Sequence, residues 1–157
     1  MRRKDREITD RNEIYDVLRR CDTLRIAIHD DEYPYAVPVS FGTEIINDRI
    51  VIYFHSALEG KKIELIKKNP HVCIEGDIFH RTQETAHGIT VHYESVIGFG
   101  ECRFVEEQEE IVHGLELVMK HYGYLERSVE QCGSTAHVAV GKIVLDEITG
   151  KRNLPID

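Results

Sequence analysis

The sequence has no long apolar run, and this absence excludes membrane-spanning helices. No stretch approaches the roughly 18 consecutive apolar residues that such a helix needs. The first residues, Met1 to Glu7, are charged and no apolar stretch follows them, so we expect no secretory signal. The four cysteines include no CxxC pair, which is typical of reduced thiols in a chain without export signals. Together these absences predict a cytoplasmic protein with no membrane partner.

A surplus of basic residues is also missing. The formal net charge is −8, whereas a non-specific nucleic-acid binder needs a basic surface to displace the counterions of the phosphates. We therefore expect no nucleic-acid partner. Hydrophobic residues make up 41% of the 157 residues and charged residues 31%, which indicates a globular chain with one core. The sequence predicts a single domain over residues 1–157.

Hydrophobic periodicity predicts a mainly β (α+β) fold. Asp10 and Glu13 form a capping-box pattern in front of a first helix that runs to Cys21. Two further helices are expected over Ala57–Lys68 and Glu106–Tyr122. Six strands are expected over Leu24–Ile28, Tyr35–Phe41, Ile50–His55, His71–Glu75, Val91–Phe104 and His137–Ile148.

The connections between these elements favour antiparallel pairing, because strands joined by short turns usually pair with each other. Asn47 and Asp48 mark a tight turn, Gly76–Gly88 is expected to be a loop, and Gly98 with Gly100 indicates a bulge or bend. Six strands in a small domain must cover their edges, and a barrel does so. The pattern predicts a six-stranded antiparallel β-barrel with peripheral helices.

The segment His55–Lys62 has unusual chemistry for a helix start. Ser56 and Glu59 fit a capping box, but Gly60 in a first turn costs up to about 1 kcal/mol relative to alanine. Lys61 and Lys62 add positive charge near the positive end of the helix dipole. A bound phosphate would reverse the sign of that interaction. The alternative, an ordinary helix start whose lysines face water, explains the local pattern about equally well.

Pro38 lies inside an expected strand. Proline cannot donate a hydrogen bond to a ladder, so this strand belongs at an edge or is locally unpaired. An open edge leaves backbone groups free for a ligand such as a flavin ring. It is equally consistent with a proline that only blocks edge-to-edge aggregation.

Four segments in this order resemble the pyridoxamine 5′-phosphate oxidase-like FMN-binding split barrels, and among them the nitroimidazole-resistance (Nim-type) branch. They are Tyr35–Phe41, Ile52–Ala57, Gly60–Lys62 and Tyr93–Gly100, and the resemblance extends over about residues 10–148. It implies a split barrel that forms a homodimer with FMN at the subunit interface. FAD could use the same phosphate anchor.

The resemblance also implies which residues contact the cofactor. The isoalloxazine ring would lie along Val37, Pro38, Val39, Ser40 and Phe41, the phosphate on His55, Ser56, Lys61 and Lys62, and Glu94, Ser95 and Val96 would come from the other subunit. No residue set for pyridoxal phosphate is evident, and no side chain has an acid–base or nucleophilic role of its own, so the flavin would carry the chemistry. The expected function is an FMN-dependent oxidoreductase that passes electrons to a small organic acceptor. The alternative is a non-catalytic flavin or haem store.

Nine histidines allow two further interpretations. His55, His87 or His92 could be an axial haem ligand. His80 groups with His87 and His92, and His113 lies eight residues before His121, but neither set has the spacing of a zinc site. We expect no metal site.

Overall fold

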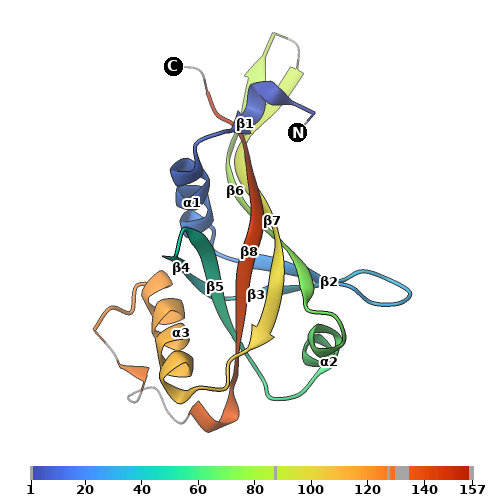
Figure 1. The fold of residues 1–157 in the computed structure, drawn as a ribbon. Helices are drawn as coiled ribbons and strands as arrows, with labels where there is room; N and C mark the ends of the chain where they lie inside the picture. The colour runs from blue at the N-terminus through green and yellow to red at the C-terminus, as the bar shows by residue number, and fades with distance from the viewer. Residues whose placement is uncertain (1, 87, 127, 130–134, 156–157) are drawn as a thin grey trace.

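The computed structural model describes residues 2–86, 88–126, 128–129 and 135–155, which form an antiparallel sheet with three α-helices around it (Figure 1). The helices are α1 (Arg11–Arg20), α2 (Lys61–Lys68) and α3 (Gln108–His121). The strands are β1 (Glu7–Ile8), β2 (Leu24–Ile28), β3 (Tyr35–Val39), β4 (Phe41–Ile46), β5 (Arg49–Ser56), β6 (His71–Thr85), β7 (Gly88–Phe104) and β8 (Ala139–Asn153). Two short 3₁₀ turns, Lys4–Arg6 and Thr135–His137, flank β1 and β8.

The hydrogen-bonded order of the strands is β3-β2-β6-β7-β8-β5-β4, and β1 pairs with the far end of β8. Every ladder is antiparallel, as predicted. The two ends of this path, β3 and β4, are joined through Ser40 alone. The sheet must therefore curve until its two edge strands approach each other. The described ladders show no closure between β3 and β4, so the closed split barrel stays a prediction.

The prediction of six strands was wrong, because the described residues form a sheet of eight strands. The expected strand Tyr35–Phe41 ends at Val39, and β4 starts anew at Phe41 after the exposed Ser40. The short strand β1 carries only two residues, too few for an alternating pattern. The strand predicted at His137–Ile148 begins at Ala139 and continues to Asn153.

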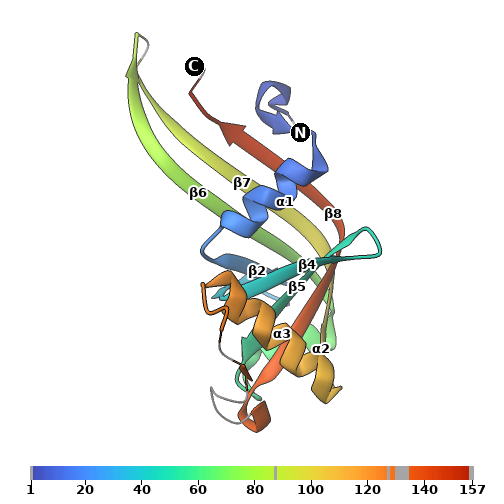
Figure 2. The same ribbon diagram turned by 90° about the vertical axis from the view of Figure 1, so that its left-hand side faces the viewer.

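The expected loop Gly76–Gly88 was also wrong. β6 continues to Thr85 and pairs with β7 from Gly88 onward, so the two strands form a long hairpin that projects beyond the rest of the sheet (Figure 2). Side chains from Phe79 to Thr85 are all exposed. A strand that is exposed on both faces has no alternation of apolar and polar residues, and this alternation was the only signal available in the sequence.

Several local predictions are confirmed. Asp10 is the N-cap of α1, and its side chain accepts a hydrogen bond from the backbone N–H of Asn12 at 2.7 Å. Asn47 and Asp48 have φ values of 48° and 60°, which suits a tight β-hairpin turn. The register of β7 on β8 shifts between Phe99 and Gly100, which is the expected bulge. No helix in the described part of the chain is long and apolar enough to cross a membrane.

The core lies inside the curved sheet and beneath α1 and α2. Its largest fully buried side chains include Leu18 of α1, Ile26 of β2, Phe41 of β4 and Phe54 of β5. α3 packs on the other side of β4 and β5. There Gly42 has no room for a side chain, because a Cβ atom would lie 2.3 Å from the backbone carbon of Leu117. Gly42 therefore sets how closely α3 approaches the sheet.

Candidate functional site

The start of α2 is the centre of the candidate site, and it differs from the prediction. α2 begins at Lys61 rather than near Ala57, and its N-cap is Gly60 with φ 133°. Ser56 is therefore no N-cap; it ends β5 and pairs with Ala139. The capping-box interpretation of Ser56 and Glu59 was wrong because Gly60 adopts a conformation that side chains disfavour and starts the helix there.

No side chain caps α2. The carbonyl of Gly60 accepts hydrogen bonds from the N–H groups of Ile63 and Glu64, and Gly60 makes no side-chain cap. The first N–H groups of a helix lack partners within the helix and point toward its N-terminal end. The open glycine leaves them accessible to an anion.

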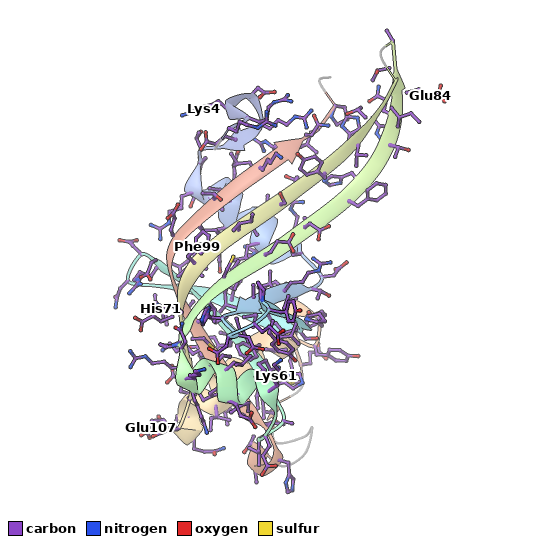
Figure 3. The ribbon with its side chains drawn as sticks, turned by 90° about the vertical axis from the view of Figure 1, so that its right-hand side faces the viewer. Lys4, Lys61, His71, Glu84, Phe99 and Glu107 are labelled. Carbon is purple, nitrogen blue, oxygen red and sulfur yellow. The ribbon has the colours of Figure 1, made fainter. Side chains whose placement is uncertain are left out.

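Lys61, which is labelled at the start of α2 in Figure 3, is already neutralised within the chain. Its Nζ lies 2.7 Å from Oδ2 of Asp30 and 5.1 Å from the centre of the Tyr35 ring. The hydrogen bond to Asp30 raises the pKa of Lys61. The contact ties α2 to the loop between β2 and β3, and so places the start of β3 beside the start of α2.

Lys62 has a different environment. Its side chain is half-buried, and its Nζ lies 5.3 Å from the centre of the Phe54 ring on β5. Burial lowers the pKa of Lys62. Among the described residues, no carboxylate forms an ion pair with it. A partly desolvated ammonium without an anionic partner is unfavourable, and a bound phosphate or carboxylate would relieve that cost.

The other predicted phosphate ligands lie at the end of β5. His55 is exposed, and Ser56 is partly exposed. They pair with Val140 and Ala139 of β8 and precede the four-residue connection to α2. The chain order thus brings His55 and Ser56 to the side of the sheet on which α2 begins.

The predicted ring-binding strand alternates in exposure. The side chains of Val39 and Phe41 are buried at 6% and 0% exposure, and that of Val37 packs against the same core. Pro38 and Ser40 are exposed. β3 pairs only with β2, so it is an edge strand, as Pro38 predicted. A ligand along this strand would meet backbone groups and the exposed side chains, while Val39 and Phe41 serve the core.

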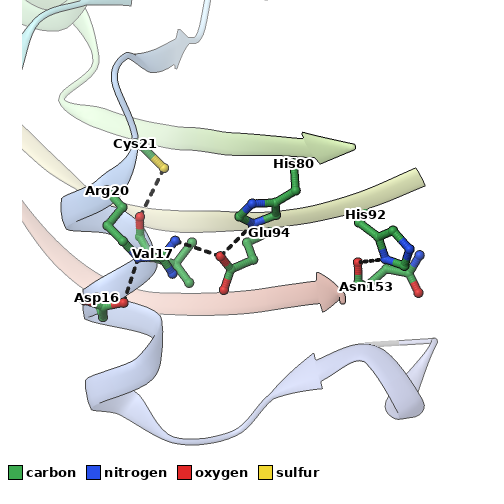
Figure 4. A network of polar contacts seen from close by, with 8 residues as sticks. All are labelled: Asp16, Val17, Arg20, Cys21, His80, His92, Glu94 and Asn153. Atoms are coloured by element: carbon green, nitrogen blue, oxygen red, sulfur yellow. Dashed lines mark hydrogen bonds and ion pairs between the residues drawn. The ribbon is translucent and has the colours of Figure 1, made fainter. Parts of the chain in front are cut away.

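The residues predicted to come from the other subunit lie on β7. Val96 is in the core at 1% exposure, and Ser95 is partly exposed. Glu94 is 4% exposed and accepts hydrogen bonds from Arg20 at 2.8 Å and from His80 at 3.0 Å (Figure 4). Burial would raise the pKa of Glu94, but these two bonds outweigh it and lower the pKa overall. These residues do not come together with Lys61 and Lys62 within one chain.

The histidines considered for haem have different surroundings. His92 is 4% exposed, and both of its ring nitrogens are engaged, Nδ1 with the carbonyl of Asn153 and Nε2 with Gln83. His55 is exposed, whereas His87 lies outside the described residues. Within the described residues, no three histidine, cysteine or acidic side chains gather as metal ligands.

Sequence reasoning missed Asp30 and Tyr35, which contact Lys61. Strands β4 and β5 lie between these two residues and Lys61 in the sequence, so no local pattern connects them. Gly60 did carry a signal, because glycine is acceptable at an N-cap and here directly precedes a run of helix-forming residues.

Comparison with known proteins identifies the family. A family model for pyridoxamine 5′-phosphate oxidase matches residues 10–152, which includes all three helices and all strands except β1 and the last residue of β8. The chain belongs to the pyridoxamine 5′-phosphate oxidase family. The comparison with curated proteins gave no match.

Solved structures with a similar fold agree with the architecture described above. A candidate 5-nitroimidazole antibiotic resistance protein from Bacteroides thetaiotaomicron is 33% identical, with 93% of this chain and 86% of that chain covered and a TM-score of 0.81. A FAD-binding protein from Mesorhizobium loti is 21% identical, with 95% and 98% covered and a TM-score of 0.70. A flavocytochrome from Azotobacter vinelandii is 14% identical, with 100% and 74% covered and a TM-score of 0.77. The last two show similarity of fold alone.

Proposed function

We propose that this member of the pyridoxamine 5′-phosphate oxidase family is an FMN-binding oxidoreductase that passes electrons to a small organic acceptor such as a nitroaromatic compound or a quinone. The observation that carries the proposal is Lys62, a half-buried ammonium without a carboxylate partner in the described structure, at the uncapped start of α2. The 33% identity to a candidate 5-nitroimidazole resistance protein supports the choice of acceptor.

The residues present fit a flavin phosphate. Lys62 and the free N–H groups of α2 would meet its charge, and Ser56 and His55 would donate hydrogen bonds from the end of β5. The exposed backbone edge of β3 around Pro38 would lie along the ring. The flavin, when bound, supplies the redox chemistry, and the chain supplies position and charge.

We further propose that the functional unit is a homodimer with the cofactor at the subunit interface. The side chains of Ile97 and Phe99 are 43% and 50% exposed on the outer face of β7, next to the partly exposed Cys73 of β6. Apolar side chains grouped on the middle of a sheet are typical of a surface that a second subunit covers.

The sharpest test replaces each lysine separately. Lys62→Gln is expected to weaken FMN binding by about 1–3 kcal/mol, because it removes the charge that faces the phosphate. Lys61→Gln is expected to weaken it less, since Asp30 already neutralises that ammonium. Fluorescence quenching of FMN on titration with protein measures both.

Lys67→Gln is the matched control, because Lys67 is an exposed lysine on the same helix. An unchanged FMN affinity in Lys62→Gln would contradict the phosphate assignment. A purified protein that shows no flavin absorption and gains none with added FMN would contradict the whole proposal.

A non-catalytic flavin store is the second candidate. It shares the same phosphate anchor, and turnover separates the two. Reduction of bound flavin by NADH or NADPH, followed by reoxidation with a nitroaromatic acceptor, supports the oxidoreductase. Flavin that binds but does not turn over supports the store.

A further inference from the structure

A second hollow lies between α1, β4 and α3, away from the start of α2. In Figure 1 α3 and α2 lie on opposite sides of the sheet, and Figure 2 shows α1, β4 and α3 together on the near face. The cavity has a volume of about 690 Å³, within the range of small-molecule sites. It therefore has room for a ligand of its own beside the proposed flavin site.

Two exposed cations, each from the last turn of its helix, belong to the lining of this cavity. Arg19 comes from α1, where its guanidinium lies 6.0 Å from the centre of the Tyr15 ring, and Lys120 comes from α3. In the part of the chain that the structure describes, neither forms an ion pair. In a chain with a net charge of −8, two unpaired cations at one hollow form a local site for an anion.

The remaining walls are polar on one side and apolar on the other. Glu44 also lines the cavity. Its Oε1 lies 2.8 Å from Nε2 of His113, so this carboxylate is hydrogen-bonded to a neighbouring side chain. Ile45 and Leu117, together with the Tyr15 ring, provide the apolar surface. Nε2 of His121 donates to the carbonyl of Cys21 at 2.9 Å, which fixes that ring in place.

We propose that this cavity is a second ligand site, for a small aromatic carboxylate. The carboxylate lies between Arg19 and Lys120, the aromatic body rests on Ile45 and Leu117, and a polar substituent on that body reaches the Glu44–His113 pair. His113, which pairs with Glu44, and His121, which bonds to the carbonyl of Cys21, are both part of the wall of this one site.

The test uses FMN-saturated protein and 4-hydroxybenzoate as the probe, measured by isothermal titration calorimetry. Binding with a dissociation constant below about 1 mM is expected. The neutral isostere 4-hydroxybenzamide is expected to bind at least about tenfold more weakly, because it lacks the charge that Arg19 and Lys120 recognise. Equal binding of the two probes, or no binding of the carboxylate, overturns the proposal.

Variants then locate the site. The double variant Arg19→Gln, Lys120→Gln is expected to weaken binding of the carboxylate by about tenfold or more. The control double variant Arg81→Gln, Lys67→Gln removes the same charge from exposed positions elsewhere and is expected to leave binding unchanged. Equal effects of the two double variants, or competition of the probe with FMN, would show that the probe does not occupy this cavity. Because the probes are compared on the wild-type protein first, a variant that fails to fold does not decide the outcome.

Discussion

Lys61 and Lys62 are neighbours in sequence, yet one is compensated by the chain and the other is not. Lys61 reaches out to Asp30, whereas Lys62 turns toward the Phe54 ring and loses hydration. The local sequence predicted two equivalent phosphate ligands. The difference arises from the loop between β2 and β3, which the chain brings to α2 from about thirty residues away, and no local pattern reports such a contact.

The single residue Glu94 is expected to stabilise the fold in a pH-dependent way. It is buried between Arg20 and His80, and its pKa in the folded chain is lowered. The charged carboxylate therefore stabilises the fold above the ordinary carboxyl pKa of about 4.3, and this contribution is lost as the pH falls through the lower folded-state value. Glu94→Gln is expected to lower the free energy of unfolding by about 1–3 kcal/mol at pH 7. Urea unfolding at pH 7 and at acidic pH measures the difference between wild type and variant.

Asp16→Asn is the control for this prediction. Asp16 also pairs with Arg20, at 2.8 Å, but its side chain is 58% exposed. An exposed pair contributes little, so a loss of at most about 0.5 kcal/mol is expected. Equal losses in the two variants, or a difference for Glu94→Gln that grows at acidic pH, would contradict the role of burial.

Helices and strands that bury one face could be predicted from the sequence, whereas those without a buried face could not. Ile14, Val17 and Leu18 of α1 follow the helical period and are buried, as expected. The outer half of β6, Phe79–Thr85, is exposed, and it pairs with β7 through the backbone ladder and through the side-chain contact of Gln83 with His92. α2 began four residues later than expected because a helix start depends on one backbone conformation, that of Gly60, more than on composition.

The packing of α3 on β4 leads to a prediction for Gly42. A Cβ atom at this position would lie 2.3 Å from the backbone of Leu117, which cannot move without displacing the helix. Gly42→Ala is expected to lower the free energy of unfolding by about 1–3 kcal/mol or more. Chemical unfolding followed by circular dichroism measures it.

Ser40→Ala, two positions earlier at an exposed site, is the control and is expected to change stability by no more than about 0.5 kcal/mol. A Gly42→Ala variant as stable as wild type would mean that α3 can shift at little cost.

For the whole molecule, the family and the antiparallel mainly-β class were predicted from sequence, and the number of strands was not. Segments such as His55–Lys62 carried the family resemblance, which the match over residues 10–152 confirms. The division of Tyr35–Phe41 into two strands at Ser40 was not predicted, because the chain passes from one edge of the sheet to the other without residues typical of a turn. The cofactor contacts and the dimer remain proposals that rest on surfaces of one subunit.

The proposed dimer can be tested by changing the exposed apolar face of β7. The double variant Ile97→Lys, Phe99→Lys places two charges on the exposed apolar face of β7 and is expected to produce a monomer with weakened FMN binding. Analytical ultracentrifugation measures the mass. Leu125→Lys, at a side chain that is 71% exposed elsewhere, is the control and is expected to leave the dimer intact. A double variant that keeps the mass and FMN affinity of the wild type would place the interface on another face.

The position of β8 has a consequence for synthesis in the cell. β8 is the last strand in the described part of the chain, yet it lies in the middle of the sheet and pairs with both β5 and β7. Until β8 has been synthesised, the two halves of the sheet lack the strand that joins them, and the edges of β5 and β7 are open to other chains. The sheet is therefore completed only once β8 is available to pair. A chain that terminates before Ala139 is expected to be retained by chaperones or degraded rather than to accumulate as a smaller folded protein.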